Sequence, residues 1–544
     1  MKNNFIKQTA IYTAAIAVSL GAVSCSKLDE TVFGSKSVVT KSADGASTAD
    51  LKSVYEATNS LVGQENTVFA LQEHSTDELL GPTRGTDWDD FGTWRKIHLH
   101  AVDGAHNQLE KIWNGLNGGL YKATLVAEKG VAAEQPAAKF LRAFLATQVM
   151  DVFGQVPYRS ATDGPDVIPA VKTRSEAFDW IMADLNAAIA ALPSNAAKTD
   201  SRLATKQAAQ FLKARLLLNK VVYKADPKTP TTFASHAAAD MNEIIALVDA
   251  ITASGRFDLS TNYWDNFVWD NNAKSKELIY SRGGADADKA GQLGGTINVN
   301  FATGMGTHYN QSFSGWNGFT TTADFYNSFK IDSAGVDVTR DKRRNADIAG
   351  YTELTGMNAG FMAGQQYTYN NAKNDKNIGV KREVLDRSGG KLIFTPDVSL
   401  FFSTESKGIR TMKYPMEYKA SDNSFTGKND YVFFRYADAL LMKAEAILRG
   451  GTATGGQTAL SIVNSIRTRS GAPALTAVVL NDILPERGRE LYLESVRRPD
   501  LIRFGKYNDP VNERAVKSDA SRVVYPIPNI AVSSNPNLKQ NFGY

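Results

Sequence analysis

Apolar residues recur at helical spacing toward both ends of the chain, and this periodicity limits the possible fold more than any other feature. Phe178, Ile181, Leu185 and Ile189 form one such stripe, which stops at Pro193. Apolar residues three or four positions apart mark one face of a helix. The same spacing predicts helices over residues 102–128, 137–153, 175–192, 204–222, 237–251, 436–448, 460–470 and 483–496. Helices of this length with short connections are expected to pack as antiparallel pairs.

The middle of the chain, about residues 255–430, is rich in Gly, Asn, Asp, Thr, Ser and aromatic residues. Leu278-Ile279-Tyr280 and Leu392-Ile393-Phe394 indicate short strands, and most of the rest is typical of loops. A loop-rich segment of this length is uncommon in a compact domain unless it carries function. We therefore expect a mostly α-helical protein with one domain over 49–544. Its helical scaffold would cover about 100–254 and 431–510, and its loop-rich part about 70–100 and 255–430.

Cys25 is the only cysteine among the 544 residues, and it follows an apolar segment from Ile11 to Val23. Lys2 and Lys7 precede this segment, and small residues lead up to the cysteine, as in a signal that is cleaved after export. A thiol at the first mature position can be acylated, so we expect a signal peptide over 1–24 and lipidation of Cys25. Residues 25–48, rich in Ser, Ala, Gly and Lys, would then form a flexible tether. An ordinary secretory signal is the alternative, because Ala22 stands where lipoprotein signals usually carry Leu.

Composition favours a globular protein and argues against a nucleic-acid binder and against a membrane span beyond the signal. With 43% hydrophobic and 22% charged residues the chain is typical of a globular protein. Its formal charge is +4, and removal of the two N-terminal lysines brings it closer to neutral, which argues against a nucleic-acid partner. Beyond the signal no apolar run approaches the roughly 20 residues that span a bilayer. The lipid at Cys25 is therefore the expected attachment to the membrane.

Several motifs follow one another in an order that resembles a known family. The first runs from Arg435 to Ala446, with the sequence Arg-Tyr-Ala-Asp-Ala-Leu-Leu-Met-Lys-Ala-Glu-Ala. The others are Glu486-Arg487, Glu490-Leu491, Glu494, the run from Arg497 to Gly505, Tyr525-Pro526-Ile527-Pro528, and the tail from Asn535 to Tyr544. Upstream, Phe140 to Phe144 and Val152 to Tyr158 also fit. Together these segments resemble the SusD-like (RagB/SusD) outer-membrane nutrient-binding lipoproteins, from about Cys25 to the last residue.

This resemblance implies a SusD-like fold, with tetratricopeptide-like helix pairs beside an irregular, ligand-facing half. It also implies a lipid-anchored protein at the cell surface of the outer membrane, which binds oligosaccharide or polysaccharide and delivers it to a SusC-like TonB-dependent transporter. The alternative is a peptide-capture subunit or structural transporter lid of RagB type with little glycan affinity. The charged signature residues are expected to form structural ion pairs; they are Arg435, Glu445, Glu490, Glu494, Arg497 and Arg498.

A glycan site needs exposed aromatic rings for the C–H faces of sugars and polar groups for the hydroxyls. Two stretches have this composition: Asp77 to Trp94, where Gly and Pro predict a loop, and His308 to Gly318. Both resemble stretches that line the glycan site in SusD-like proteins. The candidate ligand-binding residues are Asp77, Arg84, Trp88, Tyr309, Trp316 and Asn317. The competing interpretation is burial in the core, as for most tryptophans.

We expect no catalytic residue, metal or cofactor. The sequence has no Gly-x-Ser-x-Gly elbow, no phosphate-binding loop and no His-Glu-x-x-His motif. Acidic residues between Asp77 and Asp90 could supply the two carboxylates of a glycoside hydrolase, but spacing along a loop does not establish spacing in space. His98, His100 and His106 are interpreted as surface or packing residues.

Overall fold

The computed structural model describes residues 49–62, 67–194, 200–283, 304–332, 335–369, 379–419, 421 and 424–544. Every described residue belongs to one compact unit, bounded by Ser37 and Tyr544. The predicted signal peptide, Cys25 and the tether lie outside the described residues, so these assignments stay predictions. Among the described residues, no helix combines the length and the apolar character that crossing a membrane requires.

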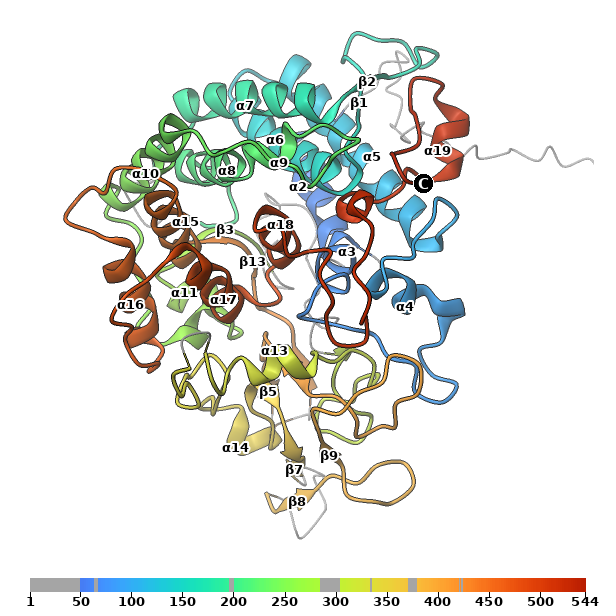
Figure 1. Ribbon diagram of the computed structural model, residues 1–544, viewed down its shortest axis with the longest axis vertical. Helices are drawn as coiled ribbons and strands as arrows, with labels where there is room; N and C mark the ends of the chain where they lie inside the picture. The colour runs from blue at the N-terminus through green and yellow to red at the C-terminus, as the bar shows by residue number, and fades with distance from the viewer. Residues whose placement is uncertain are drawn as a thin grey trace, which may run out of the picture. The chain divides into compact units, whose positions relative to one another are not determined.

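The longer helices lie in the two parts of the chain where the periodicity predicts them (Figure 1). The first part contains α2 (Leu51–Ala57), α3 (Val68–Glu73), α4 (Thr93–His98), α5 (Asn107–Lys129), α6 (Gln135–Phe153), α7 (Arg174–Ala191), α8 (Lys206–Leu218), α9 (Lys220–Tyr223) and α10 (Ala238–Ala253). The second contains α15 (Tyr436–Leu448), α16 (Ala459–Arg469), α17 (Leu480–Leu491), α18 (Arg497–Arg503) and α19 (Asn529–Ser534). The mostly α-helical class is confirmed.

Local side chains set several helix ends. The Thr173 hydroxyl accepts from the Glu176 amide, and the Glu176 carboxylate accepts from the Thr173 amide, so a capping box starts α7. Gly154, with φ of 73°, ends α6 in the left-handed conformation. Helix α5 starts five residues after the predicted Val102, because the Asp103 carboxylate accepts from the Ala105 amide and His106 then caps the helix.

Consecutive long helices pack against one another. Helix α5 packs on α6, α6 on α7, α7 on α8 and α8 on α10; α10 then packs on α15, which also contacts α16 and α17. Every residue of α15 from Tyr436 to Ala446 is buried. The two helical parts of the chain are therefore joined through α15.

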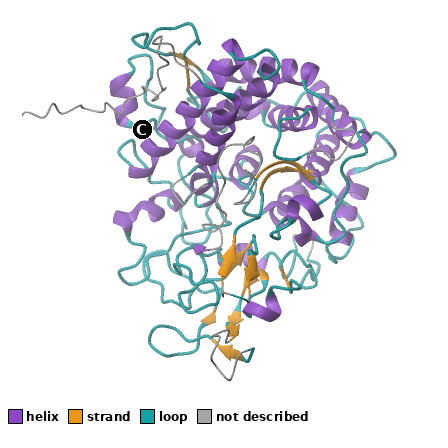
Figure 2. Cartoon of the chain, turned by 180° about the vertical axis from the view of Figure 1, so that it is seen from behind, coloured by secondary structure: helices purple, strands orange, loops and turns teal. Residues whose placement is uncertain are grey.

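The middle of the chain contains short strands, short helices and loops (Figure 2). Its helices are α11 (Asn271–Lys274), α13 (Ala323–Asn327) and α14 (Thr352–Thr355). The strands are β3 (Leu278–Arg282), β4 (Asn345–Ala346), β5 (Ala359–Met362), β6 (Gly364–Gln365), β7 (Tyr367–Tyr369), β8 (Lys381–Glu383), β9 (Ile393–Phe394), β10 (Arg410–Met412), β11 (Glu417–Lys419), β12 (Ser424–Thr426) and β13 (Tyr431–Arg435). Earlier in the chain, β1 (Val156–Tyr158) pairs with β2 (Ala170–Lys172).

All the described strand pairs are antiparallel, and the sheets have two or three strands. The predicted strands at residues 278 and 392 are confirmed as β3 and β9. Strand β3 pairs with β13, with Leu278 opposite Arg435 at the start of α15. The β3–β13 pair therefore connects the loop-rich part directly to α15.

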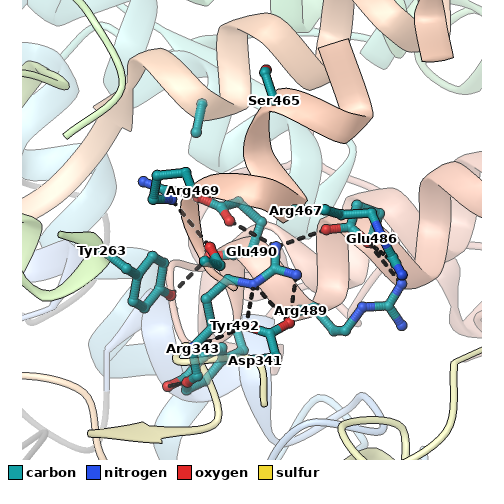
Figure 3. Close-up of polar contacts among 12 residues, drawn as sticks. Tyr263, Asp341, Arg343, Ser465, Arg467, Arg469, Glu486, Arg489, Glu490 and Tyr492 are labelled. Carbon is teal, nitrogen blue, oxygen red and sulfur yellow. Dashed lines mark hydrogen bonds and ion pairs between the residues drawn. The ribbon is translucent and has the colours of Figure 1, made fainter. Parts of the chain in front are cut away.

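A buried network of arginines and carboxylates fixes α15, α16 and α17 to the loops. Figure 3 shows the part of this network around Arg343, Glu486 and Glu490. Arg435 donates to Glu490 at 2.6 Å and to Glu494 at 2.7 Å, and it lies 3.1 Å from Glu277. Arg343 joins Glu486 at 2.7 Å and Glu490 at 2.8 Å. Each of these charges is almost fully buried, so removal of one partner leaves an uncompensated charge in the interior.

The other charged signature residues have structural partners too. Arg497 pairs with Asp77, Arg498 with Asp151, and Glu445 with Arg503. All six signature residues are buried. The prediction that the signature residues form structural ion pairs is confirmed.

Helix α17 ends before its predicted end. The pattern indicates a helix over 483–496, but α17 ends at Leu491, and Leu493 and Ser495 have left-handed φ values of 58° and 59°. Two buried carboxylates bind the amides that follow the helix: Glu78 accepts from Leu493 at 3.0 Å, and Glu73 from Ser495 at 2.7 Å. These contacts connect residues more than 400 positions apart and turn the chain toward α18.

Candidate functional site

The two predicted aromatic stretches meet in the structure. The Trp88 indole Nε1–H donates to the main-chain carbonyl of Trp316 at 2.8 Å, although the residues lie 228 positions apart. The Trp316 side chain is 54% exposed, and Trp88 is half-buried. An exposed tryptophan with this large an apolar area needs a reason, since such rings are normally buried. We call these two residues the tryptophan pair.

Two buried aromatic side chains pack against the Trp88 ring. Its ring centroid lies 5.0 Å from that of Phe319 and 6.2 Å from that of Trp94, and both of those residues are buried. The indole also lies against Gly318: a Cβ atom there would be 2.8 Å from Trp88 Cδ2 and closer still to two other ring atoms. Glycine is therefore required at 318 for the observed position of Trp88.

The backbone near the tryptophan pair is strained. Trp88, Phe91 and Asn317 have φ values of 63°, 54° and 49°, in the left-handed region that side chains other than glycine rarely adopt. Such conformations persist only where the surroundings impose them, and they concentrate at binding sites. Here the surroundings are hydrogen bonds from the amides of Trp316, Asn317 and Gly318 to the carbonyls of Gly304, Thr307 and Met305.

Arg84 and Asn317 lie beneath the tryptophan pair. Arg84 is 3% exposed and donates to the carbonyls of Gly318, Thr404 and Lys407. Asn317 is 1% exposed, and its amide oxygen accepts from Arg410 at 2.7 Å. We therefore expect both residues to hold the loops together rather than to contact a ligand. Burial lowers the pKa of Arg84 to about 9, which leaves the guanidinium charged at neutral pH.

Asp77 is engaged elsewhere. Its two carboxylate oxygens accept from Arg497 at 2.8 and 2.6 Å, at the start of α18. Burial raises the pKa of Asp77, but the charge and hydrogen bonds of Arg497 outweigh that effect and lower it overall. The geometry thus gives Asp77 a role in attaching its loop to the helices, where sequence reasoning predicts a ligand contact.

Tyr309 belongs to a small polar group beside the pair. Its hydroxyl donates to Asp87 at 3.2 Å, and the Arg387 guanidinium lies 4.7 Å from the centre of its ring. Arg387 also bonds Asp87 at 2.8 Å and pairs with Glu405. Glu405 accepts from the His308 ring at 3.1 Å. Burial lowers the pKa of His308, so this contact is a hydrogen bond with a neutral imidazole at pH 7.

An open hollow adjoins this group, with an empty volume of about 820 Å³. Gly85 and Asp89 of the Trp88 loop line it, together with Phe401 and Phe402. Phe402 is 85% exposed and Phe401 45%. Sequence reasoning missed these rings, although two consecutive Phe residues in a polar loop are a usable signal. It also missed Arg387, for which the sequence offers no comparable sign.

The two carboxylates beside the tryptophan pair, Asp87 and Glu405, are engaged by Arg387 and His308. A hydrolase general acid needs a carboxyl with a raised pKa. Burial raises the pKa of Glu405, but hydrogen bonds from Arg387 and His308 lower it overall, and Asp87 is bound to the same arginine. Within the described part of the chain, no three His, Cys, Asp or Glu residues are grouped so that they could hold a metal ion. His98 and His100 are buried and bond main-chain carbonyls.

Comparison with known proteins covers almost the whole chain. A family model described as the SusD family matches residues 276–544, and one described as starch-binding associating with outer membrane matches residues 23–218. The starch-binding protein SusD of Bacteroides thetaiotaomicron is 26% identical over 433 residues, which cover 75% of this chain and 72% of that protein.

Solved structures show the same fold. A SusD superfamily protein from Parabacteroides distasonis has a TM-score of 0.66 at 18% identity and covers 91% of this chain and 98% of its own. Surface glycan-binding protein A from Bacteroides thetaiotaomicron, in complex with laminarihexaose, has a TM-score of 0.61 at 18% identity and covers 90% and 98%. Sequence motifs, helical architecture and both family models agree, and the chain belongs to the SusD-like (RagB/SusD) family.

Proposed function

We propose that this protein binds oligosaccharide or polysaccharide at the tryptophan pair and leaves the glycan intact. The observation that carries the proposal is the exposed Trp316 ring beside Trp88. Strained loops hold both residues, and Trp88 packs on the buried ring of Phe319. A flat indole offers apolar area to the C–H face of a sugar, and nearby polar groups can bind its hydroxyls. Asp87, Arg387 and Tyr309 stand beside the pair in that role.

The names of the relatives support a carbohydrate ligand. One relative is a starch-binding protein, and one structural neighbour was solved with laminarihexaose. Neither name identifies the glycan that this chain binds. Arg387 bonds Asp87 beside the pair and Phe402 lines the adjoining hollow, and we expect loop side chains such as these to determine the specificity.

The test is affinity electrophoresis in gels that contain a glycan. The double variant Trp88→Ala/Trp316→Ala should lose retardation while remaining folded, with an unfolding temperature somewhat below that of the wild type because Trp88 also packs on Phe319 and Trp94. Phe542→Ala is a matched control, because Phe542 is 55% exposed but belongs to neither the site nor its hollow. Unchanged retardation of the double variant would refute the site. Retention of peptides and of no glycan would favour peptide capture, and release of reducing sugar would favour a hydrolase.

We further propose that lipid at Cys25 anchors the protein to the outer membrane at the cell surface, where it passes glycan to a SusC-like TonB-dependent transporter. A family description that includes association with the outer membrane supports this location. Purification of the tagged protein in mild detergent should recover a large β-barrel protein. A Cys25→Ser variant should leave the membrane fraction, and its retention there would contradict lipid anchoring.

A further inference from the structure

A second open hollow lies among the short strands of the loop-rich part, with an empty volume of about 1120 Å³. Its walls come from α14 and from strands β4 to β8, which Figure 1 shows at the lower end of the fold. Its lining includes Asn345, Asp347, Asn358, Gln365, Tyr367 and Tyr369. Amides, carboxylates and aromatic rings therefore line one open space.

Strand geometry places the two tyrosines together. Alternate residues of a strand point to the same face, so Tyr367 and Tyr369 of β7 share one face while Thr368 points to the other. The contacts agree: the Thr368 hydroxyl lies 2.7 Å from Ser312 Oγ, whereas both tyrosines line the hollow. Lys381 stands opposite Tyr369 on β8, and its ammonium lies 4.1 Å from the centre of the Tyr367 ring.

This hollow is separate from the tryptophan pair. The segment from His308 to Ser312 stands between them, because Tyr309 bonds Asp87 of the first site while Gln311 donates to Gln366 at the second. Neither tryptophan belongs to the lining of the second hollow. A ligand could therefore occupy it while the tryptophan pair is filled.

The chemistry of the lining fits a neutral sugar. Both tyrosines are half-buried, so part of each ring remains accessible. The Asn358 amide donates to Asp347, which orients both groups at the wall. Among the described residues of the lining, Asp347 and Glu353 are anionic and Lys381 is cationic, so this part of the lining disfavours an anionic ligand. Hydroxyl groups can both donate to these carboxylates and accept from the amides and the ammonium.

We propose that this hollow is a second carbohydrate-binding site, which takes a neutral oligosaccharide or a distant part of the same polysaccharide. The inference rests on the proposed glycan binding for the class of its ligand. Two sites on one folded unit raise the effective concentration of the second contact once the first has formed. A weak second site would therefore strengthen retention of a long polysaccharide more than binding of a short oligosaccharide.

Native mass spectrometry and calorimetric titration with laminarihexaose and maltoheptaose test this inference, with a broad array of neutral glycans if neither binds. The variants are Tyr367→Ala/Tyr369→Ala and Trp88→Ala/Trp316→Ala, with Phe542→Ala as control. We expect two bound oligosaccharides on the wild-type and control proteins and one on each double variant. Retention by the matching polysaccharide should fall about tenfold in the tyrosine variant.

The outcomes separate the two proposals. If the tryptophan variant binds nothing while the tyrosine variant matches the wild type, there is a single site and this inference is overturned, but the proposed function stands. If no protein binds any glycan on the array, both fall. Should the tyrosine double variant unfold, Tyr369→Ala alone replaces it, because the structure gives the Tyr369 side chain no hydrogen bond or ring contact among the described residues.

Discussion

Gly318→Ala should weaken both the fold and glycan binding without adding or removing a ligand contact. The new methyl group would lie 2.8 Å from Trp88 Cδ2, well inside van der Waals contact, so the indole must move. Overpacking of this kind typically costs about 1–3 kcal/mol of the free energy of unfolding. Displacement also removes the 2.8 Å bond from Trp88 to the Trp316 carbonyl, which is worth about 1 kcal/mol. A loss of about 1 kcal/mol in binding free energy weakens affinity about fivefold, and a loss of about 1.4 kcal/mol weakens it tenfold. We therefore expect glycan binding to weaken about five- to tenfold.

Urea unfolding gives the first quantity and calorimetric titration with the glycan gives the second. Gly118→Ala is the matched control, because nothing lies within 4 Å of a Cβ atom at that position in α5. It should raise the free energy of unfolding by about 0.5–1 kcal/mol and leave binding unchanged. If Gly318→Ala alters neither stability nor affinity, Trp88 does not rest on Gly318 and the argument for a preformed tryptophan pair fails.

Further predictions concern the buried charges. Arg435→Met should lower the free energy of unfolding by about 3–5 kcal/mol in guanidinium denaturation, because Glu277, Glu490 and Glu494 lose their shared partner; a loss under about 1 kcal/mol would contradict the network. Asp77→Asn should lower stability but not glycan affinity, since Asp77 bonds Arg497, and a large loss of affinity at unchanged stability would restore Asp77 as a ligand contact. Burial raises the pKa of Glu445, but Arg503 outweighs it and brings the pKa to about 2, so the stability that Glu445 contributes above its ordinary 4.5 should disappear as the pH falls toward 2. Burial raises the pKa of Glu73 to about 7, and burial together with the Glu73 charge raises the pKa of Glu78, so the contribution of this pair is complete below pH 4.5 and is lost as the pH rises through 7. Thermal melts of Glu73→Gln/Glu78→Gln should lack this decline, and an unchanged decline would assign it to other groups.

Local periodicity predicts the helical scaffold well, because each apolar stripe encodes the face that its helix buries. Helix α15 begins and ends where its stripe predicts, at Tyr436 and Leu448. The errors arise where contacts distant in sequence decide. No pattern between 483 and 496 reveals that Glu73 and Glu78 will bind the amides of Ser495 and Leu493 and end α17 early.

For the candidate site too, local sequence patterns predict some features, and contacts distant in sequence decide the others. Loop composition, together with the family resemblance, brings Trp88 and Trp316 to attention, and the structure places them in contact. Composition cannot distinguish a polar side chain on the surface of a loop from one beneath it. Arg84 and Asn317 are buried because three loops meet over them, an arrangement that exists only in three dimensions. Arg387 joins the site for the same reason, from a segment 300 positions away from Asp87.

The most direct measurement is a crystal structure of the protein with an oligosaccharide selected in the binding screen. The account predicts a sugar ring stacked on the Trp316 indole, with hydroxyl groups bonded to side chains beside Trp88 and with every glycosidic bond intact. Sugar bound only far from Trp316, or a cleaved product in its place, would contradict it.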